Sequence, residues 1–188
     1  MKTGMIVLLA VGLAALLSVY EFVHIRNKLA TEKEAIAKQY GDVDTALQRR
    51  ADLIPNLVET VKGYAKEETG VMEALANARA AMMGAKTPAD KSAADSQISG
   101  ALGRLMVVVE NYPNLKADQS FIDLQRQLEG TENRILQSRR TYNESVQEYN
   151  SDLVVFPANI IGSMSGFQRD DAYFKTEPGA RTAPKVQF

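Results

Sequence analysis

Residues 121–156 have the sequence FIDLQRQLEGTENRILQSRRTYNESVQEYNSDLVVF, in which a large apolar side chain recurs at every seventh position. A seven-residue repeat keeps such side chains on one stripe of an α-helix. The positions three residues further along are mostly small or polar, so the helix must pack on a wider face within a bundle. The predicted bundle seam consists of Phe121, Leu128, Ile135, Tyr142, Tyr149 and Phe156.

The preceding sequence also has helical periodicity. Apolar and small residues recur in steps of three and four over residues 36–64 and again over residues 98–112, without the alternation that is typical of strands. Thr87, followed by Pro88, and Asp118 are typical residues for helix starts. Pro55 predicts that the first helix kinks or restarts near that residue. We therefore predict an all-α fold.

Residues 26–157 are predicted to form an elongated antiparallel bundle. The number of helices depends on whether the chain turns between Lys66 and Gly70. A turn there gives four segments, whereas a helix that tolerates Gly70 gives three. Both alternatives remain open at this point.

The N-terminal sequence GMIVLLAVGLAALLSVY, residues 4–20, contains no charged residue. As a helix it would span roughly 25 Å, close to the hydrocarbon thickness of a bilayer. A cleaved secretory signal is the alternative, but no small-residue cleavage site ends this stretch. We therefore expect residues 1–25 to be a retained single transmembrane anchor. Basic residues after the anchor, including Arg26 and Lys28, outnumber those before it, which favours a cytoplasmic bundle.

Residues 158–188 are predicted to form an irregular tail, because the sequence there is rich in proline and glycine. No charge occurs from Leu153 to Gln168. This stretch could cover the end of the bundle, or it could contact the membrane interface or a partner protein. The residues for that contact are Phe156, Ile160, Ile161 and Phe167.

Composition excludes several function classes. The 22 basic and 23 acidic residues give a net charge of −1, which argues against a nucleic-acid partner. The absence of cysteine excludes disulfides and thiolate metal sites, and the single histidine, His24, excludes sites that need several histidines. We predict no catalytic, cofactor or metal site.

Charged and amide side chains lie beside the apolar faces of two predicted helices. Glu132 and Arg139, seven residues apart, share one helical stripe. The favoured interpretation is a network of interhelix ion pairs and hydrogen bonds, whereas an acid–base pair, a carboxylate metal site or a headgroup contact at Arg49 and Arg50 are less favoured alternatives. The predicted network comprises Arg49, Arg50, Asp52, Glu129, Glu132, Arg134, Arg139, Arg140 and Asn143.

Several short motifs occur in order along nearly the whole chain. They are QRRADLIPNLV (48–58), VKGYA (61–65), VENYP (109–113), GTENRI (130–135), RRTYN (139–143), FPANII (156–161) and APKVQF (183–188). Together they resemble the LemA family of bacterial membrane proteins. One departure is the sequence after the anchor, where EFVH (21–24) replaces the Tyr-Asn pair that members often show.

The resemblance implies an N-terminal anchor in the bacterial inner (cytoplasmic) membrane, a helical bundle and no established enzymatic activity. Some relatives are linked to membrane organisation, including magnetosome formation, and others to a membrane metalloprotease. The predicted function is a membrane-anchored, homo-oligomeric helical scaffold in cell-envelope or membrane organisation. The alternative is an adaptor for a membrane protease or an envelope-stress system. The expected partners are membrane lipid, further copies of the chain and such a membrane protein.

Overall fold

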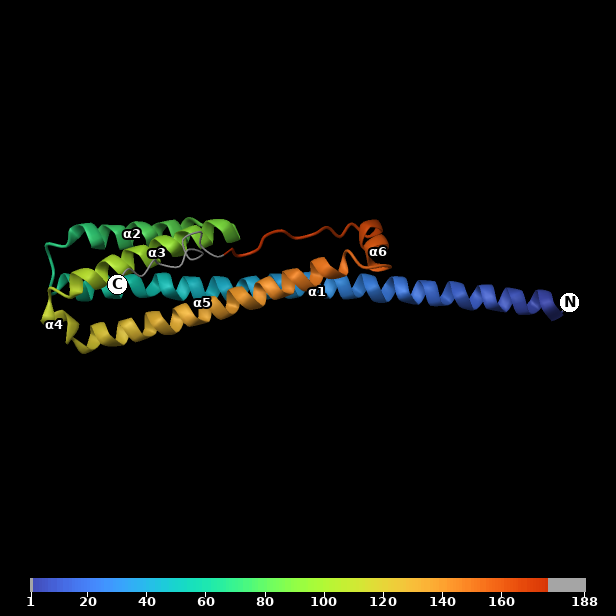
Figure 1. The fold of residues 1–188 in the computed structure, drawn as a ribbon, viewed down its shortest axis with the longest axis horizontal. Helices are drawn as coiled ribbons and strands as arrows, with labels where there is room; N and C mark the ends of the chain where they lie inside the picture. Colours follow the sequence, from blue (N-terminus) through green and yellow to red (C-terminus); the bar gives the residue numbers. More distant parts are fainter. Residues whose placement is uncertain (1, 176–188) are drawn as a thin grey trace, which may run out of the picture. The chain divides into compact units, whose positions relative to one another are not determined.

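The computed structural model describes residues 2–175, and these residues form helices and no strand. The predicted all-α fold is therefore confirmed. Figure 1 shows the helices in chain order: α1 (Lys2–Lys62), α2 (Thr69–Gly84), α3 (Pro88–Val109), α4 (Pro113–Lys116), α5 (Gln119–Asp152) and α6 (Ala158–Met164). Residues 176–188 of the predicted tail lie outside the described residues.

The chain turns between α1 and α2. Backbone N–H groups of Tyr64 and Ala65 donate to the carbonyl of Val61 at 3.0 and 2.8 Å, which closes the end of α1. The body therefore has four long helices rather than three. No restart occurs at Pro55, because α1 continues through it and its apolar neighbours Ile54 and Leu57 are both buried.

The fold divides into two compact units. Unit 1 consists of Met1–Gln39 and Asn143–Asp171, and unit 2 of Tyr40–Tyr142 and Ala172–Phe188. The long helices α1 and α5 each contribute one part to unit 1 and the other part to unit 2.

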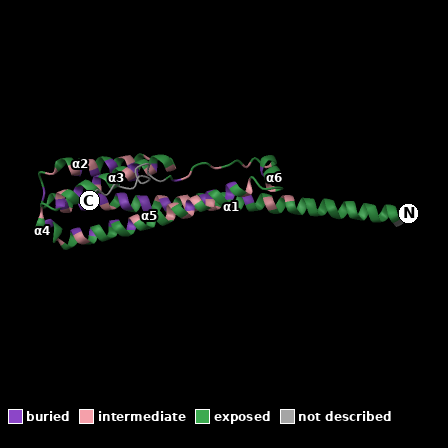
Figure 2. Ribbon diagram, in the orientation of Figure 1, coloured by how far each residue is buried: buried purple, intermediate pink, exposed green. Residues whose placement is uncertain are grey.

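Unit 2 is a four-helix bundle formed by parts of α1 and α5 together with α2 and α3. Its core is apolar, and Figure 2 shows buried residues recurring along each of these helices. Since short connections join consecutive helices, neighbours run antiparallel. The largest fully buried side chains of unit 2 include Leu47, Ile54 and Leu57 of α1, Leu75 of α2, Ile98 and Leu105 of α3, and Phe121 and Ile135 of α5.

Two helix starts in unit 2 have the predicted caps. The hydroxyl of Thr87 accepts from the backbone N–H of Asp90 at 3.1 Å, and the Asp90 carboxylate accepts from the backbone of Thr87. Asp118 accepts from the backbone N–H of Phe121 at 3.0 Å and from the hydroxyl of Tyr64 at 2.8 Å. These hydrogen bonds hold the pKa of Asp118 below its usual value.

The predicted seam on α5 is buried at five positions. Phe121, Leu128, Ile135 and Tyr142 are buried in unit 2, and Tyr149 is buried in unit 1. The sixth position is a correction: Phe156 lies beyond the end of α5, and its side chain is 74% exposed. The helix ends at Asp152, before Pro157, because proline disfavours helical geometry in the residue ahead of it and has no N–H to donate.

Unit 1 includes a short helix, α6, within the stretch predicted to be irregular. Gly162 of α6 packs so closely that an added Cβ would lie 2.7 Å from Leu153 Cδ2 and 3.4 Å from Leu29 Cδ1. Leu29 on α1 is completely buried. This contact fixes α6 against α1 and the end of α5.

After α6 the chain is extended and hydrogen-bonds to α5 within unit 1. The hydroxyl of Tyr149 donates to the carbonyl of Gln168 at 2.9 Å. The Asn150 side chain donates to the carbonyl of Asp170 at 2.6 Å and accepts from its N–H at 2.9 Å. The segment after α6 is therefore held along α5 by buried side chains.

The first part of α1 is exposed along its whole length. Every residue from Thr3 to Glu21 is exposed, as Figure 2 shows. This helix is long and apolar enough to cross a membrane, and its most apolar window has a mean hydropathy of 2.4. By length and composition it is thus a candidate membrane span.

Candidate functional site

A buried polar network joins three helices of unit 2. Arg50 on α1 has its Nη1 2.6 Å from Asp95 Oδ1 and also 2.6 Å from Glu132 Oε2. Its Nη2 donates to the Ser99 hydroxyl at 3.1 Å. Arg139 Nη2 on α5 lies 3.0 Å from Asp95 Oδ2. The carboxylate of Asp95 on α3 therefore lies between two arginines that come from different helices.

Burial makes this network costly to disturb. Asp95 is 3% exposed and Arg50 is 5% exposed. The two arginines and two carboxylates carry no net charge together, which is the condition for burying ions at modest cost. Arg50 Nε and Arg139 Nε have no hydrogen-bond partner among the described residues. The guanidinium groups thus already lack acceptors, and each remaining carboxylate contact matters more.

The structure brings together three residues of the predicted network, namely Arg50, Glu132 and Arg139. Sequence reasoning missed Asp95, which interacts with both arginines. A signal was present, because Asp95 follows buried Ala94 and lies three residues before buried Ile98, on a face where Lys91 is the only other charged residue among those buried.

The other predicted network residues lie elsewhere. Arg49 and Asp52 are exposed on α1, line an open hollow that also involves Gln127 of α5, and do not join the buried cluster. Asp52 accepts from the Gln48 side chain at 2.9 Å. The remaining members lie on α5: Glu129, Arg134 and Arg140 are exposed, and Asn143 is half-buried in unit 1.

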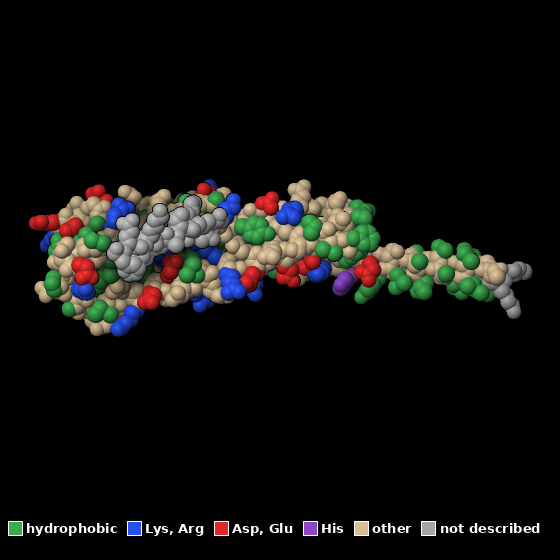
Figure 3. All heavy atoms as spheres, in the orientation of Figure 1, with side chains coloured by type: hydrophobic (Ala, Val, Ile, Leu, Met, Phe, Trp, Pro, Cys, Tyr) green, Lys and Arg blue, Asp and Glu red, His purple; other side chains and the backbone are tan. Residues whose placement is uncertain are grey.

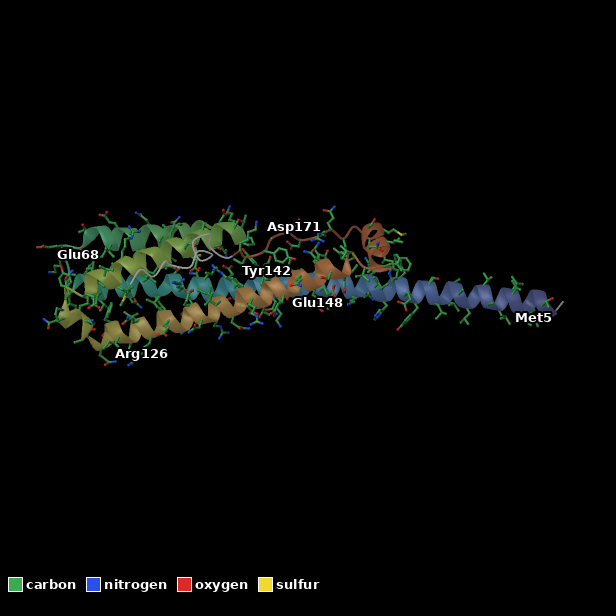
Figure 4. The ribbon with its side chains drawn as sticks, viewed as in Figure 1. Met5, Glu68, Arg126, Tyr142, Glu148 and Asp171 are labelled. Carbon is green, nitrogen blue, oxygen red and sulfur yellow. The ribbon has the colours of Figure 1, made fainter. Side chains whose placement is uncertain are left out.

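An aromatic cluster in unit 2 covers one side of the network. The rings of Tyr40, Tyr142 and Phe174 lie with centroids 5.3 to 6.4 Å apart. The Arg139 guanidinium lies 5.2 Å from the centroid of the Phe174 ring, a cation–π distance. Tyr142, labelled in Figure 4, donates its hydroxyl proton to the carbonyl of Ala172 at 2.9 Å. The chain after Asp171 is thereby anchored on the bundle.

A second buried cation lies next to this cluster. Lys91 on α3 is buried, forms an ion pair with Asp44 on α1, and lies 5.5 Å from the centroid of the Tyr40 ring. All these charged groups therefore have partners within the protein, which favours a structural role in fixing helix register.

Unit 1 has its own small cluster of charges. Lys28 Nζ on α1 lies 2.5 Å from Asp152 Oδ2 and 3.7 Å from Glu32 Oε1. Burial and the neighbouring Asp152 raise the pKa of Glu32 to about 7. The hydrogen bond from Lys28 holds the pKa of Asp152 below its usual value. Glu32 therefore changes its charge near neutral pH.

Acidic and histidine side chains do not gather into a metal site over residues 2–175: no group of three or more is placed to hold an ion. The chemistry that the buried network supports is ion pairing between helices. These ion pairs join α1, α3 and α5 within unit 2.

Comparison with known proteins identifies the family. The model of the LemA family matches residues 39–188, so the chain belongs to the LemA family. Magnetosome protein MamQ 2 of Paramagnetospirillum magneticum is 35% identical over 89 residues, 47% of this chain and 32% of that protein. The matched part thus spans about a third of the length of this relative.

Two further relatives match over more of the chain. Magnetosome protein MamQ of Magnetospirillum gryphiswaldense is 25% identical over 182 residues, which cover 83% of this chain and 66% of the relative. Protein LemA of Metamycoplasma hominis is 23% identical over 150 residues, 77% of this chain and 68% of the relative. Together with the candidate span, the family indicates a membrane-associated helical protein.

Proposed function

We propose that this LemA-family chain is a single-pass membrane protein whose helical body acts as a non-catalytic scaffold in the organisation of a bacterial membrane. The observation that carries the proposal is the continuity of α1. One helix runs without a break from the exposed apolar stretch to the buried core residues Ile54 and Leu57. An apolar helix with no protein contact needs an apolar solvent, and a bilayer supplies it.

The relatives support the second half of the proposal. Two of the relatives are named magnetosome proteins, and this supports the role in membrane organisation that the family resemblance implies. The buried ion pairs support a structural body rather than a reactive site, because the described arginines of the network contact carboxylates on other helices. A scaffold needs such fixed helix register to present a constant surface.

Membrane extraction tests the anchor. The full chain should stay in the membrane pellet after alkaline carbonate treatment, whereas the double variant Leu9→Arg/Leu13→Arg should be released. Each arginine near the middle of a span costs about 2.5–3.5 kcal/mol of insertion free energy. Val107→Arg, an exposed apolar position on α3, is the matched control and should remain in the pellet. Release of the unmodified chain by carbonate would contradict the anchor. So would mass spectrometry of the intact protein showing that the apolar stretch has been cleaved off.

We propose further that the scaffold is a homo-oligomer in the inner membrane. Confinement of identical anchors to one bilayer raises their effective concentration and favours lateral association. Light scattering of the full chain in detergent should give a mass above that of the monomer plus its micelle. A monomeric mass, together with capture of one reproducible second protein after cross-linking in cells, would favour the adaptor role instead.

The basic residues after the span support a cytoplasmic body. Arg26 and Lys28 follow the apolar stretch directly. Since the chain has no cysteine, a single cysteine at the exposed position Arg126 reports the side. A membrane-impermeant maleimide should label it only after intact cells are lysed. Labelling of intact spheroplasts would place the body on the outer side.

A further inference from the structure

Five large apolar side chains of unit 1 are exposed around α6. They lie in the turn after α5 and on one face of α6, and each is between 51% and 74% exposed. We call them the apolar tip: Val154, Val155, Phe156, Ile160 and Met164. Soluble monomers rarely leave contiguous apolar patches of this kind in water, because covering such side chains is favourable.

The surrounding sequence makes the tip entirely uncharged. No charged residue occurs from Leu153 to Gln168, so the nearest charges along the chain are Asp152 and Arg169. The Asp152 carboxylate is held by Lys28 at 2.5 Å. The charge at the edge of the tip is therefore paired, and the tip itself carries no charge that would oppose an apolar environment.

Packing fixes which side of α6 faces outward. Ile161 is buried, Phe167 is half-buried, and Gly162 lies against Leu153 and Leu29. Ile160 and Met164 are four residues apart on the opposite, exposed stripe of the helix. Of the residues predicted for a membrane contact, Phe156 and Ile160 therefore belong to the tip, whereas Ile161 and Phe167 hold α6 in place.

The tip lies next to the candidate membrane span. The contact between Gly162 and Leu29 ties α6 to α1, and Leu29 follows Tyr20 by nine residues, roughly 13 Å of helix. Figure 3 shows hydrophobic side chains gathered in unit 1 at the point beyond which the N-terminal part of α1 continues alone. The headgroup layer of a bilayer crossed by residues 4–20 would begin just beyond Tyr20, on the side of the span where Leu29 and α6 lie.

We propose that the apolar tip inserts into the interfacial layer of the same bilayer that α1 crosses, as a second, monotopic membrane contact. The partner is a lipid surface, because the tip and the span are both exposed apolar surfaces of the same unit. The inference rests on the proposed anchor. It adds a site that the span alone does not require.

Lipid quenching tests the contact in the full chain. A single cysteine replaces Phe156 or Met164 in the cysteine-free sequence and is labelled with an environment-sensitive fluorophore. Each labelled protein is then reconstituted into phosphatidylcholine–phosphatidylglycerol vesicles. Leu13→Cys reports the anchor, and Val107→Cys on α3 is the matched exposed apolar control. Lipids that carry a quencher either near the headgroup or near the end of the acyl chain serve as the probes.

The expected result is quenching at 156 and 164, stronger by the headgroup-side quencher than by the deep quencher. Position 13 should be quenched more by the deep quencher, and position 107 should be unaffected. Quenching at 13 without quenching at 156 and 164 overturns the tip contact and leaves the anchor intact. Loss of quenching at 13 refutes the anchor itself. A blue shift at 156 that follows the protein-to-lipid ratio, without lipid quenching, overturns the proposal in favour of a second copy of the chain.

Discussion

Asp95→Asn should be one of the most destabilising conservative substitutions in unit 2. The change keeps the size of the side chain but removes the negative charge that faces Arg50 and Arg139, at 2.6 and 3.0 Å. With an effective dielectric constant of about 20, each of these contacts has a gross attraction of roughly 6 kcal/mol. Desolvation of the three ions offsets most of that sum in the native protein.

When the Asp95 charge is removed, its attraction to the arginines is lost, but the desolvation cost of the arginines remains. After the substitution Arg50 stays buried and Arg139 half-buried, and their Nε atoms already lack partners among the described residues. Breaking a buried ion pair in this way costs about 3–5 kcal/mol of the free energy of unfolding. The matched control is Asp123→Asn, which also removes one negative charge, but from an exposed carboxylate that lies 3.3 Å from Arg126. This substitution should change the free energy of unfolding by less than about 0.5 kcal/mol.

Urea unfolding of the full chain in detergent, followed by far-ultraviolet circular dichroism, measures the difference. A double-mutant cycle with Arg50→Ala and Asp95→Ala should give a coupling energy of about 0.5–3 kcal/mol, because the two side chains are in direct contact. The reasoning is refuted if Asp95→Asn and Asp123→Asn unfold at the same urea concentration.

Three further predictions concern the seam, α6 and pH. Ile135→Ala should cost about 2–5 kcal/mol in the same urea assay, whereas Leu136→Ala, its exposed neighbour, should stay within about 0.5 kcal/mol; equal losses would contradict the seam. Gly162→Val should speed amide hydrogen exchange in α6, because its Cβ has no room, whereas Gly130→Val, with open space, should leave that exchange unchanged. The raised pKa of Glu32, about 7 against an ordinary 4.5, means that the contribution of Glu32 to the free energy of unfolding is fully present below pH 4.5 and is lost as pH rises through 7; Glu32→Gln should remove this fall in urea titrations.

Local patterns predicted the helices well because helical periodicity and caps depend on neighbouring residues. The cap at Thr87 was predictable from residues 87–90, and the structure shows both hydrogen bonds between Thr87 and Asp90. The seven-residue repeat placed Ile135 and Tyr142 on the buried side of α5. It failed at Phe156 because a repeat carries no information on where its helix ends.

The polar network was harder to predict because its partners are far apart in sequence. Glu132 and Arg139 share a stripe, and both reach the cluster. Arg140 is turned roughly 100° from Arg139 around the helix, and it is exposed. The sequence around Asp95 indicates that this residue faces the core but does not identify its partners. The charged residue at helical spacing is Lys91, which pairs with Asp44, so only the contacts of α3 with α1 and α5 reveal the two arginines.

The sequence of α6 shows how one residue type can indicate opposite structures. Gly162, together with Pro157 and Gly166, suggested an irregular tail, since glycine and proline usually interrupt helices. In the structure Gly162 is helical and buried, and its missing side chain is what lets α6 approach Leu29 and Leu153. The same close approach fixes the rotation of α6, and the rotation decides that Ile161 is buried while Ile160 is exposed. The exposed apolar tip is therefore a consequence of how α6 packs rather than of a loose tail.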